Sequence, residues 1–307
     1  MTLSSPAARK PRALILSGEG SKGAWQVGVL NYLKAVGLFR SGFDIICGSG
    51  VGAINSSVIS QFDKKDFYLG IGVLHDLWET KIVSTSSVWN WRRPKYIAGL
   101  WNKSFGTSKN LRKIIEKNVD PRLIMSSDVK LHLPAVNLVD GNLKYFDCEN
   151  SEYIIDSVLA ASAFPAFFDP VKIDNGLYID GSIRDVSPLK KVIKSGAEEI
   201  LIIMSNNPYM VKPKARINNV CDVAFRAIEI ATKEIMLSDV QKCIAVNRRI
   251  ELGDKKVLER KQIKIKMIYP IHYISSPLNF SKDHLERLMS KGYMDAEFIF
   301  NKSLLER

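Results

Sequence analysis

Short apolar runs alternate along the chain with segments whose apolar residues recur at helical spacing. The runs over residues 13–17 and 43–47 predict buried strands, and each is followed by a glycine-rich turn. Helical apolar spacing follows each turn, over residues 24–36 and 51–62. A strand, a turn and a helix that occur twice in this order indicate a parallel sheet with helical crossovers, and hence an α/β fold.

The rest of the chain continues the alternation of helices and strands. Further helices are predicted over residues 67–80, 110–118, 151–162, 186–195, 220–246 and 281–305, and further strands over 130–138, 143–146, 176–179, 199–204 and 263–269. The turn Asp140-Gly141 predicts a hairpin between two of these strands. Because the chain contains no internal repeat and no low-complexity linker, we expect a single domain over residues 13–307, after a flexible polar tail over residues 1–12.

The first turn reads GEGSKG, from Gly18 to Gly23. Its commonest interpretation is a dinucleotide-binding turn, which requires an acidic residue at the end of the next strand. That strand begins near Asp44 and ends in Cys47-Gly48, so no carboxylate stands at the required position. Several backbone N–H groups at the positive end of a helix nevertheless form a cradle for an anion. In an acyl hydrolase this cradle would be an oxyanion hole.

The second turn has the spacing of a nucleophile elbow, in which a serine stands between two glycines as G-x-S-x-G. Gly48 and Gly52 occupy the two glycine positions, and Gly50 occupies the position of the nucleophile. Glycine has no hydroxyl that could attack an ester. Ser49 lies one residue from the apex, so we expect its side chain to point elsewhere, and we interpret Ser17 as structural.

A third motif, Asp180-Gly181, follows the predicted strand 176–179. A carboxylate at the end of a strand is well placed to act as a general base, although an aspartate before glycine is often only a turn residue.

Together the three motifs resemble those of the patatin-like phospholipases, from Ala13 to the terminal helix. The stretches GAWQVGVLNYL and VLAASAFPAFFDPVKIDNGLYIDGSIRDVSPL are similar to the family's helix after the oxyanion loop and to its approach to the catalytic aspartate. The resemblance implies a three-layer α/β/α fold with a mainly parallel sheet. It also implies a Ser–Asp dyad, without histidine, that hydrolyses phospholipids or other lipid esters, of phospholipase A or lysophospholipase type. The four histidines are scattered without metal-ligand spacing, so we expect no metal, and we expect no cofactor.

Carried over to this sequence, the resemblance makes Asp180 the base of the dyad and Gly181 the glycine of the motif after it. The backbone around four residues would form the oxyanion hole, and these are Gly18, Glu19, Gly20 and Gly23. Lys22 takes the basic position of this loop. Glu19 replaces a usual glycine, and Gly50 replaces the nucleophilic serine, with Gly48 and Gly52 as the glycines of the elbow.

A glycine at the elbow preserves the fold while it removes the chemistry, because glycine populates positive φ without the steric cost of a Cβ. Gly50 therefore has two interpretations. The first is a lipid acyl hydrolase inactivated by substitution of its serine. The second is a natural pseudoenzyme that binds lipid or protein.

The 307 residues carry a net charge of +12, which favours anionic partners. No recognised nucleic-acid motif is present, so we expect no nucleic-acid binding. The cluster of Trp89, Trp91, Arg92, Arg93 and Trp101 suits peripheral contact with an anionic membrane, but its tryptophans could equally cap the core.

The cellular compartment is inferred from what the chain lacks. No run of 18 apolar residues and no apolar leader occurs, and the cysteines are widely spaced (Cys47, Cys148, Cys221 and Cys243). We therefore expect a cytoplasmic protein that contacts membranes peripherally.

Overall fold

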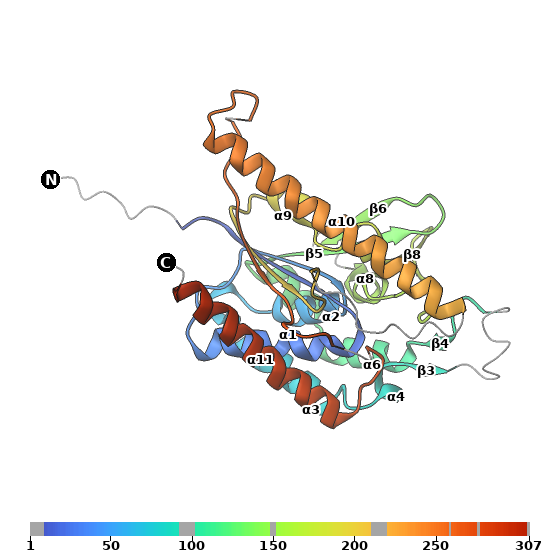
Figure 1. The fold of residues 1–307 in the computed structure, drawn as a ribbon. Coiled ribbons are helices and arrows are strands. Elements are labelled where there is room, and N and C mark those ends of the chain that lie inside the picture. The colour runs from blue at the N-terminus through green and yellow to red at the C-terminus, as the bar shows by residue number, and fades with distance from the viewer. Residues whose placement is uncertain are drawn as a thin grey trace.

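A mainly parallel sheet of eight strands separates two layers of helices. One face carries α1 (Gly23–Ala35), α3 (Phe67–Thr80) and α11 (Lys282–Leu305), and the other carries α9 (Leu189–Lys194) and α10 (Val220–Glu251) (Figure 1). This arrangement confirms the predicted three-layer α/β/α fold. The computed structural model describes residues 9–91, 102–147, 152–209, 220–257, 259–274 and 277–305.

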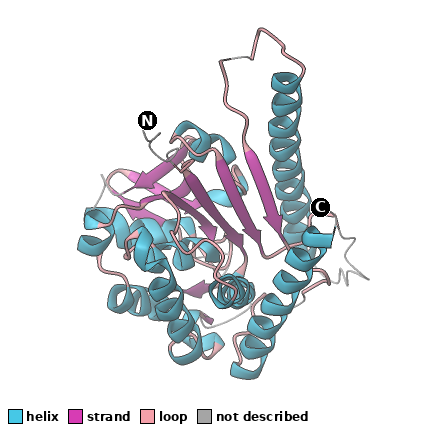
Figure 2. Cartoon of the chain, turned by 90° about the vertical axis from the view of Figure 1, so that its left-hand side faces the viewer, coloured by secondary structure: helices cyan, strands magenta, loops and turns pink. Residues whose placement is uncertain are grey.

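Five strands of the sheet run parallel. In spatial order they are β10 (Lys264–Ile268), β9 (Glu199–Met204), β1 (Arg12–Gly18), β2 (Ile45–Gly50) and β5 (Lys130–Asn137). Antiparallel pairs then add β8 (Gly176–Asp180), β7 (Val171–Ile173) and, beside β5, β6 (Leu143–Asp147). The β5–β6 pair is the predicted hairpin. Figure 2 shows the strands side by side, with α10 beside them and one of its ends projecting past the sheet.

The central strands read as continuous apolar runs because helices cover both of their faces. Leu14 and Leu16 of β1 belong to the core on the α1 face, whereas Ala13 and Ile15 belong to the core on the α9 and α10 face. All four side chains are fully buried. The apolar run that predicted this strand therefore reflects its central position in the sheet.

Element boundaries differ from the predicted ones by a few residues. The second helix, α2 (Val51–Ile59), is shorter than predicted, and α10 extends to Glu251. The remaining elements are α4 (Thr85–Val88), β3 (Asn90–Trp91), β4 (Gly106–Thr107), α6 (Lys109–Asn118), α7 (Pro121–Ser126), α8 (Ile154–Ala161) and three short 3-10 helices, η1 (Gly20–Lys22), η2 (Lys64–Asp66) and η4 (Gly181–Ile183). Within the described ranges, no helix combines the length and the apolar character that crossing a bilayer requires.

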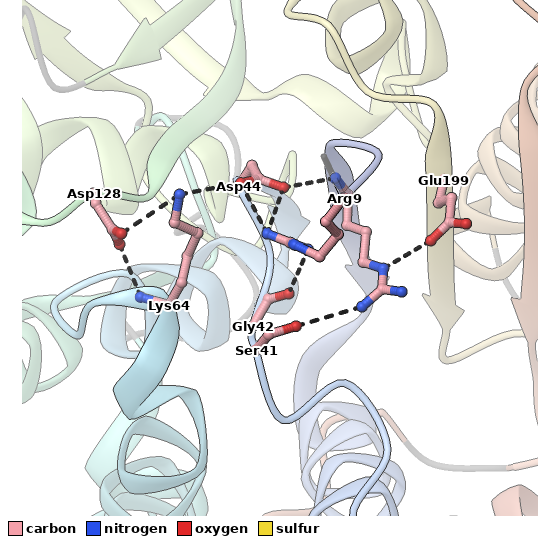
Figure 3. Close-up of polar contacts among 8 residues, drawn as sticks. Arg9, Ser41, Gly42, Asp44, Lys64, Asp128 and Glu199 are labelled. Carbon is pink, nitrogen blue, oxygen red and sulfur yellow. Dashed lines mark hydrogen bonds and ion pairs between the residues drawn. The ribbon is translucent and has the colours of Figure 1, made fainter. Parts of the chain in front are cut away.

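A charged cluster ties together the amino ends of β1, β2 and β9, at the edge of the sheet opposite the carboxyl ends (Figure 3). Asp44 accepts hydrogen bonds from the Arg9 guanidinium at 2.9 Å, from Lys64 Nζ at 3.1 Å and from the Arg12 amide at 2.7 Å. Arg12 Nε in turn donates to Glu199 Oε2 at 2.7 Å. Residues 1–8 of the predicted tail lie outside the described residues, but Arg9 and Arg12 are thus held against the sheet.

The first turn of α2 packs so closely under β1 that only a hydrogen atom fits between them. A Cβ built on Gly52 would lie 2.0 Å from the carbonyl oxygen of Leu16. This contact brings the start of α2 directly beneath the β1–β2 pair and fixes the end of β2.

We expect Gly52→Ala to destabilise the protein by roughly 1–3 kcal/mol, because the added methyl group must push backbone apart. Gly72→Ala, in the middle of α3, is the matched control, since its Cβ would meet only Lys34 Nζ at 3.4 Å. That change should stabilise the protein by about 0.5–1 kcal/mol through helix propensity. Urea denaturation measures both changes, and equal effects at the two positions would contradict the close contact at Gly52.

Candidate active site

Gly50 stands where β2 passes into α2, at the carboxyl edge of the sheet. The parallel register of β1 and β2 places it opposite Gly18. Its backbone has φ 59° and ψ −135°, a conformation that residues with a side chain rarely adopt. A Cβ built on Gly50 would lie 3.4 Å from Asp180 Oδ2 and 2.1 Å from the carbonyl oxygen of Gly18. A side chain at position 50 would therefore start beside the carboxylate of Asp180.

Asp180 ends β8 and is 2% exposed. Burial raises the pKa of this carboxyl to about 7, and the negative charge of Glu19 adds to the increase. Hydrogen bonds from Ser182 and from the Gly50 amide oppose it, and the Ser182 amide donates to Asp180 Oδ1 at 2.8 Å. A carboxyl with this pKa both takes up and releases a proton near neutral pH, as a general base must do.

The glycine-rich turn passes from β1 through η1 into α1. Gly20 has φ 48°, and the carbonyl oxygen of Pro277 lies 2.1 Å from the position of its Cβ, so the turn requires glycine there. The Glu19 amide donates to Ser205 Oγ at 3.2 Å, and the Ser21 amide donates to the Pro277 carbonyl at 2.7 Å. Among the described residues, the Gly20 amide has no such partner.

A hydrogen-bonded network holds the Glu19 side chain. Lys22 Nζ donates to Glu19 Oε2 at 3.2 Å, and Asn206 Nδ2 donates to Glu19 Oε1 at 2.8 Å. Lys22 also donates to Asn206 Oδ1 and is 3% exposed. The carboxylate that replaces a usual glycine of the loop is thus neutralised by the loop's own lysine.

The motifs identified in the sequence did not reveal Ser205 and Asn206. Both residues follow β9, and β9 is parallel to β1. Since parallel strands end at the same edge of a sheet, polar residues directly after the predicted strand 199–204 were a signal that could have placed them at this site.

The two serines nearest the elbow form hydrogen bonds with each other and with the backbone. Ser49 Oγ lies 3.1 Å from the carbonyl oxygen of Val186 and 3.3 Å from Ser17 Oγ, and both serines are buried. This geometry agrees with the expectation that Ser49 points elsewhere and that Ser17 is structural.

A pocket of about 620 Å³ opens beside Gly50 and Asp180. Its remaining wall is largely apolar and includes Val51, Ile54, Trp78, Ile82, Val88, Leu111, Phe164, Phe167, Phe168, Ile274, Leu278 and Phe280. Pockets of this size and character hold small amphiphilic ligands, with a few polar groups to orient them.

Trp89 belongs to the wall of this pocket. Its side chain is 4% exposed, its Nε1 donates to the Phe167 carbonyl at 2.7 Å, and its ring packs edge-on against the Phe167 ring. Of the two interpretations of the tryptophan cluster, Trp89 therefore fits the one in which the ring caps the core. The Trp91 side chain, Arg92, Arg93 and Trp101 lie outside the described residues.

The three-layer fold, with a glycine elbow and a buried aspartate at the carboxyl edge of a mainly parallel sheet, has the architecture of the patatin class of lipid hydrolases. Residues 14–193 match the family model described as patatin-like phospholipase. The match covers more than half of the chain, and the protein belongs to this family.

Individual relatives are more distant. A cGAMP-activated phospholipase of Pseudomonas aeruginosa (strain BWHPSA011 / Pa011) is 25% identical over 190 residues, which are 57% of this chain and 53% of the relative. The chain thus spans about half the length of this curated relative. The structure of VipD from Legionella pneumophila matches 96% of this chain and 67% of its own, with 16% identity and a TM-score of 0.46. ExoU in complex with SpcU from Pseudomonas aeruginosa matches 94% of this chain and 53% of its own, with 13% identity and a TM-score of 0.35.

We expect Asp180→Asn to stabilise the protein above neutral pH by roughly 1–3 kcal/mol, because each unit of pKa shift corresponds to about 1.4 kcal/mol. With a folded-state pKa of about 7 and an ordinary value of 3.8, the native state binds more protons than the unfolded state between these pH values. The contribution of Asp180 to stability therefore falls as pH rises through this window, and asparagine removes the loss.

Urea denaturation of both proteins between pH 4 and pH 8 measures this difference. The gain should be largest at pH 8 and absent at pH 4. Asp76→Asn, on the exposed face of α3, is the control and should change stability little at any pH. A constant gain for Asp180→Asn across the range would show that burial does not raise the pKa of Asp180.

Proposed function

We propose that this chain is a patatin-like lipid acyl hydrolase in which Gly50 occupies the nucleophile position, so that the glycine form does not hydrolyse esters. The observation that carries the proposal is the geometry at Gly50. Its backbone has the strained conformation of an elbow, and a Cβ at this position would lie 3.4 Å from Asp180 Oδ2. A serine hydroxyl placed there is within hydrogen-bonding reach of the base.

With a serine at position 50, the reaction proceeds in two steps. Asp180 takes the hydroxyl proton while the serine oxygen attacks the acyl carbon, and the loop amide of Gly20 donates to the resulting oxyanion. When the intermediate collapses, the alcohol leaves with the proton from Asp180, and an acyl-enzyme remains. Asp180 then takes a proton from a water molecule while the water oxygen attacks the acyl carbon. When this second intermediate collapses, the serine oxygen leaves with the proton from Asp180 and the fatty acid is released.

We infer that the substrate is a phospholipid or another lipid ester. Family membership supports lipid as the substrate class, and the apolar wall of the pocket supports an acyl chain as its occupant. The pocket volume of about 620 Å³ lies within the range of ligand sites.

A natural pseudoenzyme that binds lipid or protein is the second candidate. The distance of 2.1 Å between the Gly18 carbonyl oxygen and the Cβ position of Gly50 favours it, because backbone must shift before any side chain fits. The pocket is available to a lipid in either case.

We predict that Gly50→Ser gives esterase activity on short p-nitrophenyl esters or on phospholipid, and that Asp180→Asn added to it abolishes this activity. Gly50→Ala is the matched control, because its Cβ meets the same carbonyl oxygen but brings no hydroxyl. Both single variants should lose about 1 kcal/mol or more of stability from the positive φ. If folded Gly50→Ser is no more active than Gly50→Ala across several acyl chain lengths and lipid classes, the hydrolase proposal fails.

We also propose that the chain is cytoplasmic and contacts anionic membranes through its net charge of +12. Binding to vesicles that contain an anionic lipid should exceed binding to zwitterionic vesicles, and salt should weaken it. Co-sedimentation at low and high salt measures both effects. Equal binding to the two kinds of vesicle would refute electrostatic attachment.

A further inference from the structure

The wall of the pocket is divided by polarity. Its aromatic part comes from α3, through Trp78, and from the segments that contain Trp89 and Phe167, whereas α4 and α6 add aliphatic side chains. All of these elements pack in the core on one side of the sheet. Opposite these elements, α10 contributes the charged and polar residues Arg226, Glu229, Thr232 and Lys233 to the wall, together with the apolar Ile228 and Met236. Figure 1 shows α10 and the pair of α4 and α6 on opposite sides of the sheet. Gly50 and Asp180, at the carboxyl edge of the sheet, line the same pocket.

Most charges on the wall are already compensated. Lys22 is paired with Glu19 at 3.2 Å, and Arg226 Nη1 is paired with Glu229 Oε2 at 2.9 Å. Lys233 is half-buried and, among the residues that the structure describes, forms no ion pair. Within the described part of the chain, the α10 side of the pocket therefore presents one cationic group, Lys233, without a carboxylate partner.

We propose that Lys233 binds the phosphate of a phospholipid headgroup whose acyl chains lie in the aromatic part of the pocket. This inference rests on the proposed function for the class of ligand, and it adds the orientation of the lipid and the residue that selects its headgroup. A half-buried ammonium group without a partner favours an anion that can displace its remaining water. The apolar wall opposite requires that this anion be joined to an acyl chain.

The orientation places the ester between the two parts of the pocket. An acyl chain against Trp78, Leu111 and Phe167 and a phosphate at Lys233 put the glycerol backbone near the carboxyl edge, where Gly50 and Asp180 lie. The same ammonium group would also attract inorganic phosphate, which has the charge but lacks the acyl chain.

The test is a binding experiment on the full chain as it is, with Gly50 in place. Dihexanoyl phosphatidic acid and dihexanoylglycerol, each below its micellar concentration, are titrated by calorimetry. The unmodified chain should bind the phosphatidic acid at least about tenfold more tightly, since one hydrogen bond to a charged group is worth about this factor. Lys233→Gln should weaken binding of the phosphatidic acid by about tenfold and leave that of dihexanoylglycerol unchanged, and Lys233→Arg should retain most of the affinity.

Lys242→Gln is the matched control, because Lys242 is an exposed lysine of the same helix, is paired with Asp239 and lies outside the pocket wall. Lys242→Gln should change neither the affinity for phosphatidic acid nor the affinity for dihexanoylglycerol. A thermal melt of each variant checks folding. If Lys233→Gln does not fold, the salt dependence of the unmodified chain replaces it, since only the affinity for phosphatidic acid should fall with salt.

Three results would overturn the inference. They are equal affinity for the two lipids, an equal loss of both affinities in Lys233→Gln, and displacement of the phosphatidic acid by inorganic phosphate at similar concentration. The last result would assign the site to a free phosphate. Binding of the lipid needs no serine, so the inference about Lys233 stands even if Gly50→Ser does not hydrolyse esters. The hydrolase proposal likewise stands even if Lys233→Gln does not weaken binding of the phosphatidic acid.

Discussion

The contact between the carbonyl oxygen of Gly18 and the α-carbon of Gly50 is the constraint on which the site depends. Parallel pairing of β1 with β2 sets these residues opposite each other, and the register continues back to Ala13 and Ile45. Neither strand can move alone without breaking that ladder. The glycine-rich turn after β1 and the turn at Gly50, which lie 32 positions apart in the sequence, are therefore placed by backbone pairing, and the close approach is possible because Gly50 lacks a Cβ.

Asp180 is brought to the same edge by a different route, since β8 joins the sheet antiparallel to β5. Its carboxyl group is surrounded by protein, which raises its pKa and makes it a base suited to neutral pH. The same burial destabilises the fold when the group ionises. The pairing of Glu19 with Lys22 limits a further increase of the Asp180 pKa, because it leaves less uncompensated negative charge near this carboxyl group. The scaffold thus retains a buried carboxyl group with a raised pKa although position 50 provides no hydroxyl that it could deprotonate.

Much of this architecture could be predicted from local sequence. Buried parallel strands appear as short apolar runs, and the spacing of Gly48, Gly50 and Gly52 predicted the tight turn between β2 and α2, where Gly50 has a positive φ. The pairing of Lys22 with Asn206 joins residues 184 positions apart, and the α10 side of the pocket depends on which helix covers that edge. The burial of Trp89 likewise depends on Phe167, 78 positions away. Such contacts follow from tertiary packing, which no local pattern encodes.

Glycine at position 50 separates binding from chemistry. In an active enzyme, part of the binding free energy serves to stabilise the transition state, and the bound ester leaves as product. Without a hydroxyl at the elbow, every contact between the pocket and a lipid contributes to the affinity of the ground state, and the ligand leaves only by dissociation. Under the proposed function, a lipid that enters this pocket is therefore bound and not converted. This conclusion holds whether the glycine replaced a serine in an enzyme or belongs to a natural pseudoenzyme, because it depends on the pocket alone.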